Sequence, residues 1–336
     1  MFSDKVIRVG GAAALLPLLV EHEVDFDALA AEAGLSAAVF ANPDHVVPFT
    51  ALCRLMNLAA DRTGLSDIGL RACVSTGLAS LGKLGYLVAN SATIERGLAA
   101  LETYLHVHDQ GAMPVMSVHE GTACLGYEIL APAMPGANQV CFGAMAIGTN
   151  ILRSLCGPDF RLLQVTFAFA RPRNTSLFRS FFGVPVRFDA DRSAIAFDSR
   201  WLATPISTAD AYLHSVLADD VRRDSDRLGE PVDEKIRRVV RSLVAGGRFS
   251  TDAAAAAFGV NRRTLARRLR DRGTSFRALL DDARYDEAQR LLQSSSIPLA
   301  EIASKLGYAD TATFTRAFRR WGGTSPRRWQ ATNRAL

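Results

Sequence analysis

The sequence predicts two parts of different fold class: an α+β domain over residues 1–228 and an all-α domain over residues 234–336, joined by a linker at 229–233. The first part mixes helix and strand periodicities, whereas the chain from Asp233 onward has helical periodicity only. Gly229-Glu230-Pro231 interrupts a helical pattern. The charge changes sign there, because residues 234–336 hold 21 Lys/Arg and 9 Asp/Glu, a net +12, against −7 for residues 1–233.

The first part begins with Ala-rich helices over about residues 10–105. Helical spacing is clearest at Asp67–Ala72 and Ile94–Tyr104. Val115–Leu130 is expected to form two short strands around the turn at Glu120-Gly121.

After these strands the pattern predicts a long apolar helix over Gln139–Cys156. The apolar alternation of Leu163, Val165, Phe167 and Phe169 predicts a strand over Leu162–Ala170. Val184–Phe188 and Ser193–Phe197 are expected to pair as a hairpin, with Asp189–Arg192 as its turn. A helix over Thr208–Leu228 closes this part.

Composition favours a globular protein in the cytoplasm. Hydrophobic residues make up 49% of the chain, too many for a disordered protein. The odd number of scattered cysteines indicates free thiols in a reducing compartment. The apolar stretch Val9–Val20 is too short to span a bilayer and has no cleavage pattern, so we expect an amphipathic helix that ends or kinks near Pro17, and no membrane partner.

Motifs for catalysis or metal binding are incomplete. Gly77 to Lys83 nearly matches a phosphate-binding loop, but Leu84 stands where a Ser or Thr would hold Mg²⁺. His106, His108 and His119 lack the further ligands of a tetrahedral metal site, so partly exposed structural histidines are expected. The chain has no G-x-S-x-G nucleophile motif. We therefore expect no enzyme activity, metal or cofactor. The aromatic residues Tyr86, Tyr104, Phe142, Phe167 and Phe169 line either a pocket or, more commonly, a core.

The basic part contains an internal repeat. Gly259, Leu265-Ala266-Arg267, Leu269 and Gly273-Thr274-Ser275 recur 48 to 50 residues later as Gly307, Phe314-Thr315-Arg316, Phe318 and Gly323-Thr324-Ser325. Each copy reads as a short helix, a tight turn with glycine, and a second helix that begins at a capping residue. The first helices are Asp252–Ala257 and Pro298–Lys305, and the caps are Asn261 and Asp310. This order is typical of a helix-turn-helix unit.

Helical spacing divides each second helix into two faces. Leu265 and Leu269 point inward in the first copy, and Phe314 and Phe318 do so in the second. The opposite faces carry Arg263, Arg267 and Arg270, and then Ala312, Arg316 and Arg319, with Thr311 at the exposed start. A recognition helix needs such an arrangement, because arginine can bond both acceptors of a guanine edge. The alternative to a recognition helix is a small helical bundle whose arginine face is only solvated. The two matched copies argue against this alternative.

The two units are expected at about 251–272 and 298–321, with a connecting helix at about 275–293. Such a helix is roughly 27 Å long. It could hold the two recognition helices about one DNA turn apart, roughly 34 Å.

Residues 234–336 resemble the DNA-binding domain of AraC/XylS-type bacterial regulators. The resemblance rests on Ile297–Ala303, Leu306-Gly307-Tyr308 and Phe314–Pro326, and on Asn261–Leu269 with Gly273–Phe276. It implies base contacts by Arg263, Arg267, Thr311, Ala312 and Arg316. Ala312 departs from the polar residue common in the family and offers only a methyl group, for instance to thymine. Contacts to the DNA backbone are expected from Asn261, Arg262, Thr264, Arg270, Thr313, Thr315, Arg319 and Arg320.

The first part resembles the arabinose-binding-like effector domain of the branch that includes ornithine- and arginine-responsive regulators. The supporting residues are Gly64, Gly69-Leu70-Arg71, Gly82, Gly85-Tyr86, Phe182–Phe188, Leu202, Pro205-Ile206 and Ala209-Asp210. The resemblance implies a domain that binds a small-molecule effector and dimerises. It identifies neither the effector nor its contact residues.

Together these observations predict a transcription regulator that binds double-stranded DNA under the control of a small molecule, acting as a homodimer and with RNA polymerase at the promoter. Two alternatives remain: an enzyme that modifies small molecules and carries a DNA-binding appendage, and a DNA-binding protein without an effector. An apolar pocket in residues 1–228 would favour the first interpretation, whereas a cleft with converging titratable groups would favour an enzyme.

Overall fold

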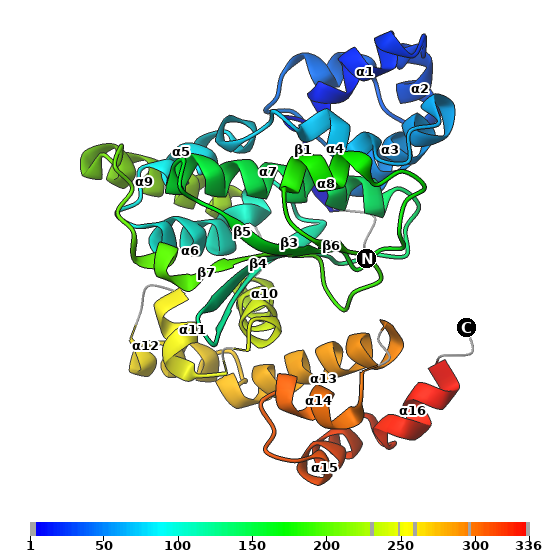
Figure 1. The fold of residues 1–336 in the computed structure, drawn as a ribbon. Helices are drawn as coiled ribbons and strands as arrows, with labels where there is room; N and C mark the ends of the chain where they lie inside the picture. The colour runs from blue at the N-terminus through cyan, green and yellow to red at the C-terminus, as the bar shows by residue number, and fades with distance from the viewer. Residues whose placement is uncertain (1–4, 229–231, 248, 258–260, 295–296, 334–336) are drawn as a thin grey trace. The chain divides into compact units, whose positions relative to one another are not determined.

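The computed structural model describes residues 5–228, 232–247, 249–257, 261–294 and 297–333. The chain divides into two compact units, Met1–Gly229 and Glu230–Leu336. We call them the N-terminal unit and the C-terminal unit (Figure 1). Each unit has its own hydrophobic core.

The N-terminal unit contains helices and a mixed sheet, which confirms the predicted α+β class. Its α-helices are α1 (Leu15–Glu21), α2 (Phe26–Glu32), α3 (Phe49–Thr63), α4 (Ile68–Cys73), α5 (Lys83–Ala89), α6 (Ile94–Tyr104), α7 (Ala137–Cys156), α8 (Ser176–Phe182) and α9 (Ala211–Arg227). Short 3₁₀ helices are η2 (Ala12–Ala14), η3 (Ala37–Ala41), η4 (Leu78–Leu81), η5 (Leu105–Val107) and η6 (Ser199–Ala203).

A five-stranded sheet forms the centre of this unit. Its order is β3 (Ala112–His119), β4 (Thr122–Ile129), β7 (Ala194–Asp198), β5 (Leu162–Thr166) and β6 (Val186–Arg187). All neighbours are antiparallel except β5 and β6, which are parallel. Two further strands, β1 (Val6–Arg8) and β2 (Val46–Pro48), pair separately. The predicted hairpin at Glu120-Gly121 is confirmed: both residues have positive φ, as a two-residue turn requires.

Helix α7 lies along the sheet, in contact with β4 and β7, and packs on its other side against α3 and α4 (Figure 1). Its Phe142 meets Phe167 and Phe178 edge to face, with ring centres 5.0 Å apart in each pair. All three rings are fully buried. This contact joins the helical layer to the sheet, since such aromatic pairs contribute more than their buried area alone.

Three local predictions were wrong. The segments at Val184–Phe188 and Ser193–Phe197 do not form a hairpin, because β5 lies between them and pairs with both. The strand at Leu162 ends at Thr166, and a shift in register between Leu162 and Gln164 leaves Leu163 half exposed. Pro17 does not end or kink the first helix; it lies in the first turn of α1, where proline is tolerated.

The C-terminal unit is helical throughout its described residues. Its helices are α10 (Val232–Ala245), α11 (Thr251–Ala257), α12 (Arg262–Arg270), α13 (Phe276–Ser294), α14 (Leu299–Lys305), α15 (Thr311–Gly322) and α16 (Pro326–Asn333). Helix α13 contacts α10, α14, α15 and α16. The core of this unit therefore surrounds the connecting helix that the sequence predicts.

Candidate nucleic-acid interface and ligand cavity

The first helix-turn-helix unit consists of α11 and α12. The side chain of Asn261 accepts the backbone N–H of Thr264 at 2.9 Å and so caps α12, as predicted. Leu265 and Leu269 are buried in the core of the unit. The predicted turn at 258–260 lies outside the described residues. Because one face of α12 is held by these leucines, the opposite face is presented to solvent.

That opposite face carries the predicted arginines. Arg263, Arg267 and Arg270 are exposed, and none of them has a carboxylate partner within the described part of the chain. Arg262 differs, because its Nε lies 3.3 Å from Asp252 of α11. Thr264 is half buried at the first turn. Three unpaired guanidinium groups on one exposed helix face can bind an anionic surface or the acceptor edge of a base.

The second unit, α14 and α15, repeats this geometry. Helix α14 begins at Leu299, one residue later than predicted, and Pro298 is its N-cap residue. Gly307 turns the chain with φ of 76°, and Asp310 caps α15 by accepting the Thr313 N–H at 2.6 Å. Phe314 and Phe318 are fully buried. The hydrogen bonds from Thr313 hold the pKa of the Asp310 carboxyl below its usual value.

The exposed face of α15 carries Ala312, Arg316 and Arg319, with Thr311 and Thr315 half exposed beside them. Arg316 donates to the Thr313 hydroxyl at 3.0 Å, and that hydroxyl donates to Asp310. Arg320 pairs with Asp281 of α13 at 3.0 Å. The structure therefore brings the predicted base-contacting residues of α15 to one surface, while Thr313 and Arg320 also hold contacts within the protein.

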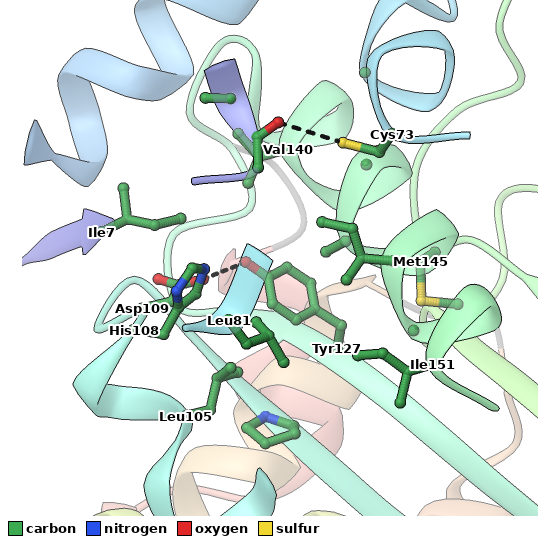
Figure 2. A pocket seen from close by; sticks show the side chains of 18 of the residues that line it. Ile7, Cys73, Leu81, Leu105, His108, Asp109, Tyr127, Val140, Met145 and Ile151 are labelled. Carbon is green, nitrogen blue, oxygen red and sulfur yellow. Dashed lines mark hydrogen bonds between the residues drawn. The ribbon is translucent and has the colours of Figure 1, made fainter. Parts of the chain in front are cut away.

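The N-terminal unit contains an apolar cavity of about 120 Å³ that is partly open to solvent. Helix α7 forms one wall with Val140, Met145 and Ile151, while Ile7 and Leu105 come from β1 and η5 (Figure 2). No lining residue of this cavity was predicted from the sequence, since these positions are scattered from Ile7 to Ile195. None of the five aromatic residues considered for a pocket lines this cavity; Phe142 and Phe167 are core, and Tyr86 is exposed.

One end of the cavity is polar (Figure 2). The Tyr127 hydroxyl donates a short hydrogen bond to Asp109, and the Gly111 N–H donates to the same carboxyl at 2.8 Å. Burial raises the pKa of Asp109 to about 6, against these hydrogen bonds, and that of Tyr127 well above its usual value. Burial, together with the nearby Arg8, lowers the pKa of His108 to about 4. Burial therefore shifts the pKa of each of these two neighbouring residues in the direction that favours its uncharged form.

His106, His119 and Lys83, which the sequence analysis considered for metal or phosphate binding, lie apart from this cavity. His106 is buried, not partly exposed, and its Nε2 lies 2.8 Å from the Ser225 hydroxyl; His119 is exposed. No cluster of metal-binding side chains occurs among the residues that the structure describes. Lys83 forms ion pairs with Asp220 and Asp224 of α9, at 3.1 and 2.9 Å, so its ammonium is engaged within the protein. None of the helices in the described ranges is long and apolar enough to cross a membrane.

A helical unit with two exposed, basic recognition faces and an α+β unit with an apolar cavity define a ligand-responsive transcription regulator. Residues 24–206 match the arabinose-binding N-terminal domain of AraC transcription regulators, and residues 254–332 match a helix-turn-helix domain family. The chain belongs to the AraC family of transcription regulators, with an N-terminal effector-binding domain and a C-terminal DNA-binding domain.

Known relatives match over most of the chain. The HTH-type transcriptional regulator VirS of Mycobacterium tuberculosis is 28% identical over 86% of this chain and 85% of its own length. The ornithine utilization regulator of Pseudomonas aeruginosa is 27% identical over 97% of this chain and 96% of its own. The crystal structure of the regulator CdpR from Pseudomonas aeruginosa is 21% identical, with a TM-score of 0.47 over 96% of this chain and 98% of CdpR.

Proposed function

We propose that α12 and α15 enter two successive major-groove segments of one DNA duplex. Arg263 and Arg267 contact base edges from α12, and Thr311, Ala312 and Arg316 do so from α15. The residues around them contact the DNA backbone: Asn261, Arg262, Thr264, Arg270, Thr313, Thr315, Arg319 and Arg320. The observation that carries this proposal is the pair of capped helices with buried apolar faces and exposed arginines.

Electrostatics supports this assignment. The net charge of +12 over residues 234–336 favours a polyanionic partner, because neutralising phosphates releases counterions. Arg263, Arg267 and Arg270 have no ion pairs among the described residues, so binding DNA would break no internal salt bridge at these positions. Two other arginines of these helices pair within the protein, Arg262 with Asp252 at 3.3 Å and Arg320 with Asp281 at 3.0 Å, so their contacts to the DNA backbone would compete with these ion pairs.

The cavity of the N-terminal unit is the proposed effector site. A concave apolar space with a few polar groups at one end is typical of a ligand site. We propose that it binds and does not catalyse. The two oxygens of Asp109 accept hydrogen bonds from Tyr127 and Gly111, which supports a role for this carboxyl in shaping the polar end of the cavity.

The regulator is proposed to act in the cytoplasm as a homodimer that reads two DNA sites, arranged in tandem or inverted, and to work with RNA polymerase at the promoter. This part rests on the family resemblance. The proposed effector site is separate from the DNA interface, because the cavity belongs to the N-terminal unit and the recognition helices belong to the C-terminal unit.

Selection of bound sequences from a random duplex pool tests the DNA-binding part of this proposal. The full chain should enrich one motif with two blocks about one helical turn apart. Its affinity should exceed that for unrelated duplex by at least about a thousandfold at physiological salt. Enrichment of a single block, or of no motif, would contradict docking by both helices.

A further inference from the structure

We propose that the cavity of the N-terminal unit binds a small uncharged molecule with a compact apolar body and one hydrogen-bonding group, which His108 receives. The inference names the chemical class of the effector and rests on the proposed function only in calling this molecule the effector. Its test measures ligand binding without DNA, so the proposed ligand class and the proposed function can fail separately.

The size of the cavity sets the size of the ligand. Several lining residues are small: Gly11, Ala12, Ala72, Gly143, Ala144 and Gly148. The volume of about 120 Å³ is close to that of an apolar protein cavity of about 150 Å³ that holds benzene. A body of about six to eight non-hydrogen atoms therefore fits without moving the walls.

The charged and amide side chains of the lining already have partners. Arg8 pairs with Asp44 at 2.7 Å. Gln139 accepts the Gly69 N–H and donates to the Ser66 carbonyl, both at 3.0 Å. A ligand carboxylate would thus meet no unmatched cation there.

A ligand ammonium would have to compete with Tyr127 and Gly111 for the oxygens of Asp109. An ammonium would also have to lose its hydration to reach a carboxyl whose two oxygens already accept hydrogen bonds, so these contacts favour an uncharged ligand.

His108 is the polar lining side chain that remains available. Its Nδ1 is buried, and the ring has no hydrogen-bond partner among the described residues. The ring lies beside Asp109 at the polar end of the cavity (Figure 2). A pKa lowered to about 4 keeps the imidazole neutral at pH 7, with one donor and one acceptor nitrogen. It can therefore bind a hydroxyl or a carbonyl group, and such a ligand would satisfy a buried polar atom.

Four compounds that share one ring test the class: toluene, benzyl alcohol, benzoate and benzylamine. Binding to the full chain at pH 7.5 is measured by calorimetry and by the shift in Tm of the N-terminal unit. We expect benzyl alcohol to bind about five- to tenfold more tightly than toluene, since it gains one hydrogen bond. Benzoate and benzylamine should bind at least about tenfold more weakly than benzyl alcohol.

Three variants locate the site. His108→Phe should reduce the affinity for benzyl alcohol to that for toluene while toluene still binds. Ala144→Leu fills the cavity and should abolish binding of both compounds. Ser154→Leu adds bulk on the exposed side of the same helix and should change neither affinity.

Three results would overturn the inference. One is tighter binding of benzoate or benzylamine than of benzyl alcohol. Another is no binding of either neutral compound to the wild-type chain. The third is an unchanged advantage of benzyl alcohol in folded His108→Phe protein. Binding that follows the prediction but leaves DNA affinity unchanged would support the ligand class and contradict the proposed effector control.

Discussion

The guanidinium group of Arg284 lies 5.0 Å from the centre of the Tyr308 ring. The same group lies 4.7 Å from the centre of the Phe249 ring. Tyr308 belongs to the turn between α14 and α15, whereas Phe249 precedes α11. Arg284, on the connecting helix α13, therefore contacts aromatic rings from both helix-turn-helix units. Gly307 packs closely on the Phe249 ring, because a Cβ atom at this glycine would lie 2.6 Å from it.

Replacing this arginine should loosen the join between the two units. Arg284→Met keeps the aliphatic stem and removes the cation, so the free energy of unfolding of the C-terminal unit should fall by about 1–2 kcal/mol. Denaturant unfolding followed by the fluorescence of Trp321 and Trp329 measures this loss. Arg277→Met, on the exposed side of the same helix, is the matched control and should have little effect. Equal effects of the two changes would show that the rings do not hold Arg284.

Loss of one base-contacting arginine should weaken DNA binding at its own position. Arg267→Ala and Arg316→Ala should each reduce the free energy of binding to the selected site by about 1–3 kcal/mol. Fluorescence anisotropy of a labelled duplex at fixed salt measures this free energy of binding. Arg268→Ala, exposed on α12 but outside the Arg263–Arg267–Arg270 face, is the control and should cost less. Wild-type affinity in both variants would contradict the docking geometry.

His108 and Asp109 should give opposite contributions to the pH dependence of stability. Asp109 keeps its proton in the folded state up to a pKa of about 6, whereas the unfolded chain loses that proton near pH 4, so this residue lowers stability as the pH rises between those values. His108 stays neutral in the folded state down to a pKa of about 4, whereas the unfolded chain takes up a proton near pH 6.5, so this residue raises stability over that range.

Single replacements should separate the two contributions. The stability of Asp109→Asn relative to wild type should increase by about 3 kcal/mol from pH 4 to pH 7, and that of His108→Asn should decrease by a similar amount. Urea unfolding of the full chain at several pH values measures both slopes. His119→Asn, which changes an exposed histidine, should run parallel to wild type. Parallel curves for all three variants would contradict the assigned pKa shifts.

The sequence predicted the C-terminal unit well because its signals are local. The caps Asn261 and Asp310, the turn at Gly307 and the apolar pairs Leu265/Leu269 and Phe314/Phe318 all lie within a few residues of the helices that they define. The resemblance to the DNA-binding domain of AraC/XylS-type regulators supported the same predictions.

The errors and omissions depend on contacts between distant residues. The strand at Ile195 pairs with Val165 and Leu125, and no pattern near Ile195 indicates those partners over an adjacent hairpin. The cavity could not be predicted for the same reason. Its lining residues come from elements far apart in the sequence, and small lining residues such as Gly143 and Ala144 carry no distinctive sequence signal for a pocket.

Site selection with two variants tests the central claim most directly. The random-pool experiment is repeated with Arg267→Ala and Arg316→Ala chains beside wild type. If α12 and α15 read separate groove segments, each variant should lose base preference in a different block of the motif and keep the other block. Unchanged motifs, or loss in the same block for both variants, would contradict the account.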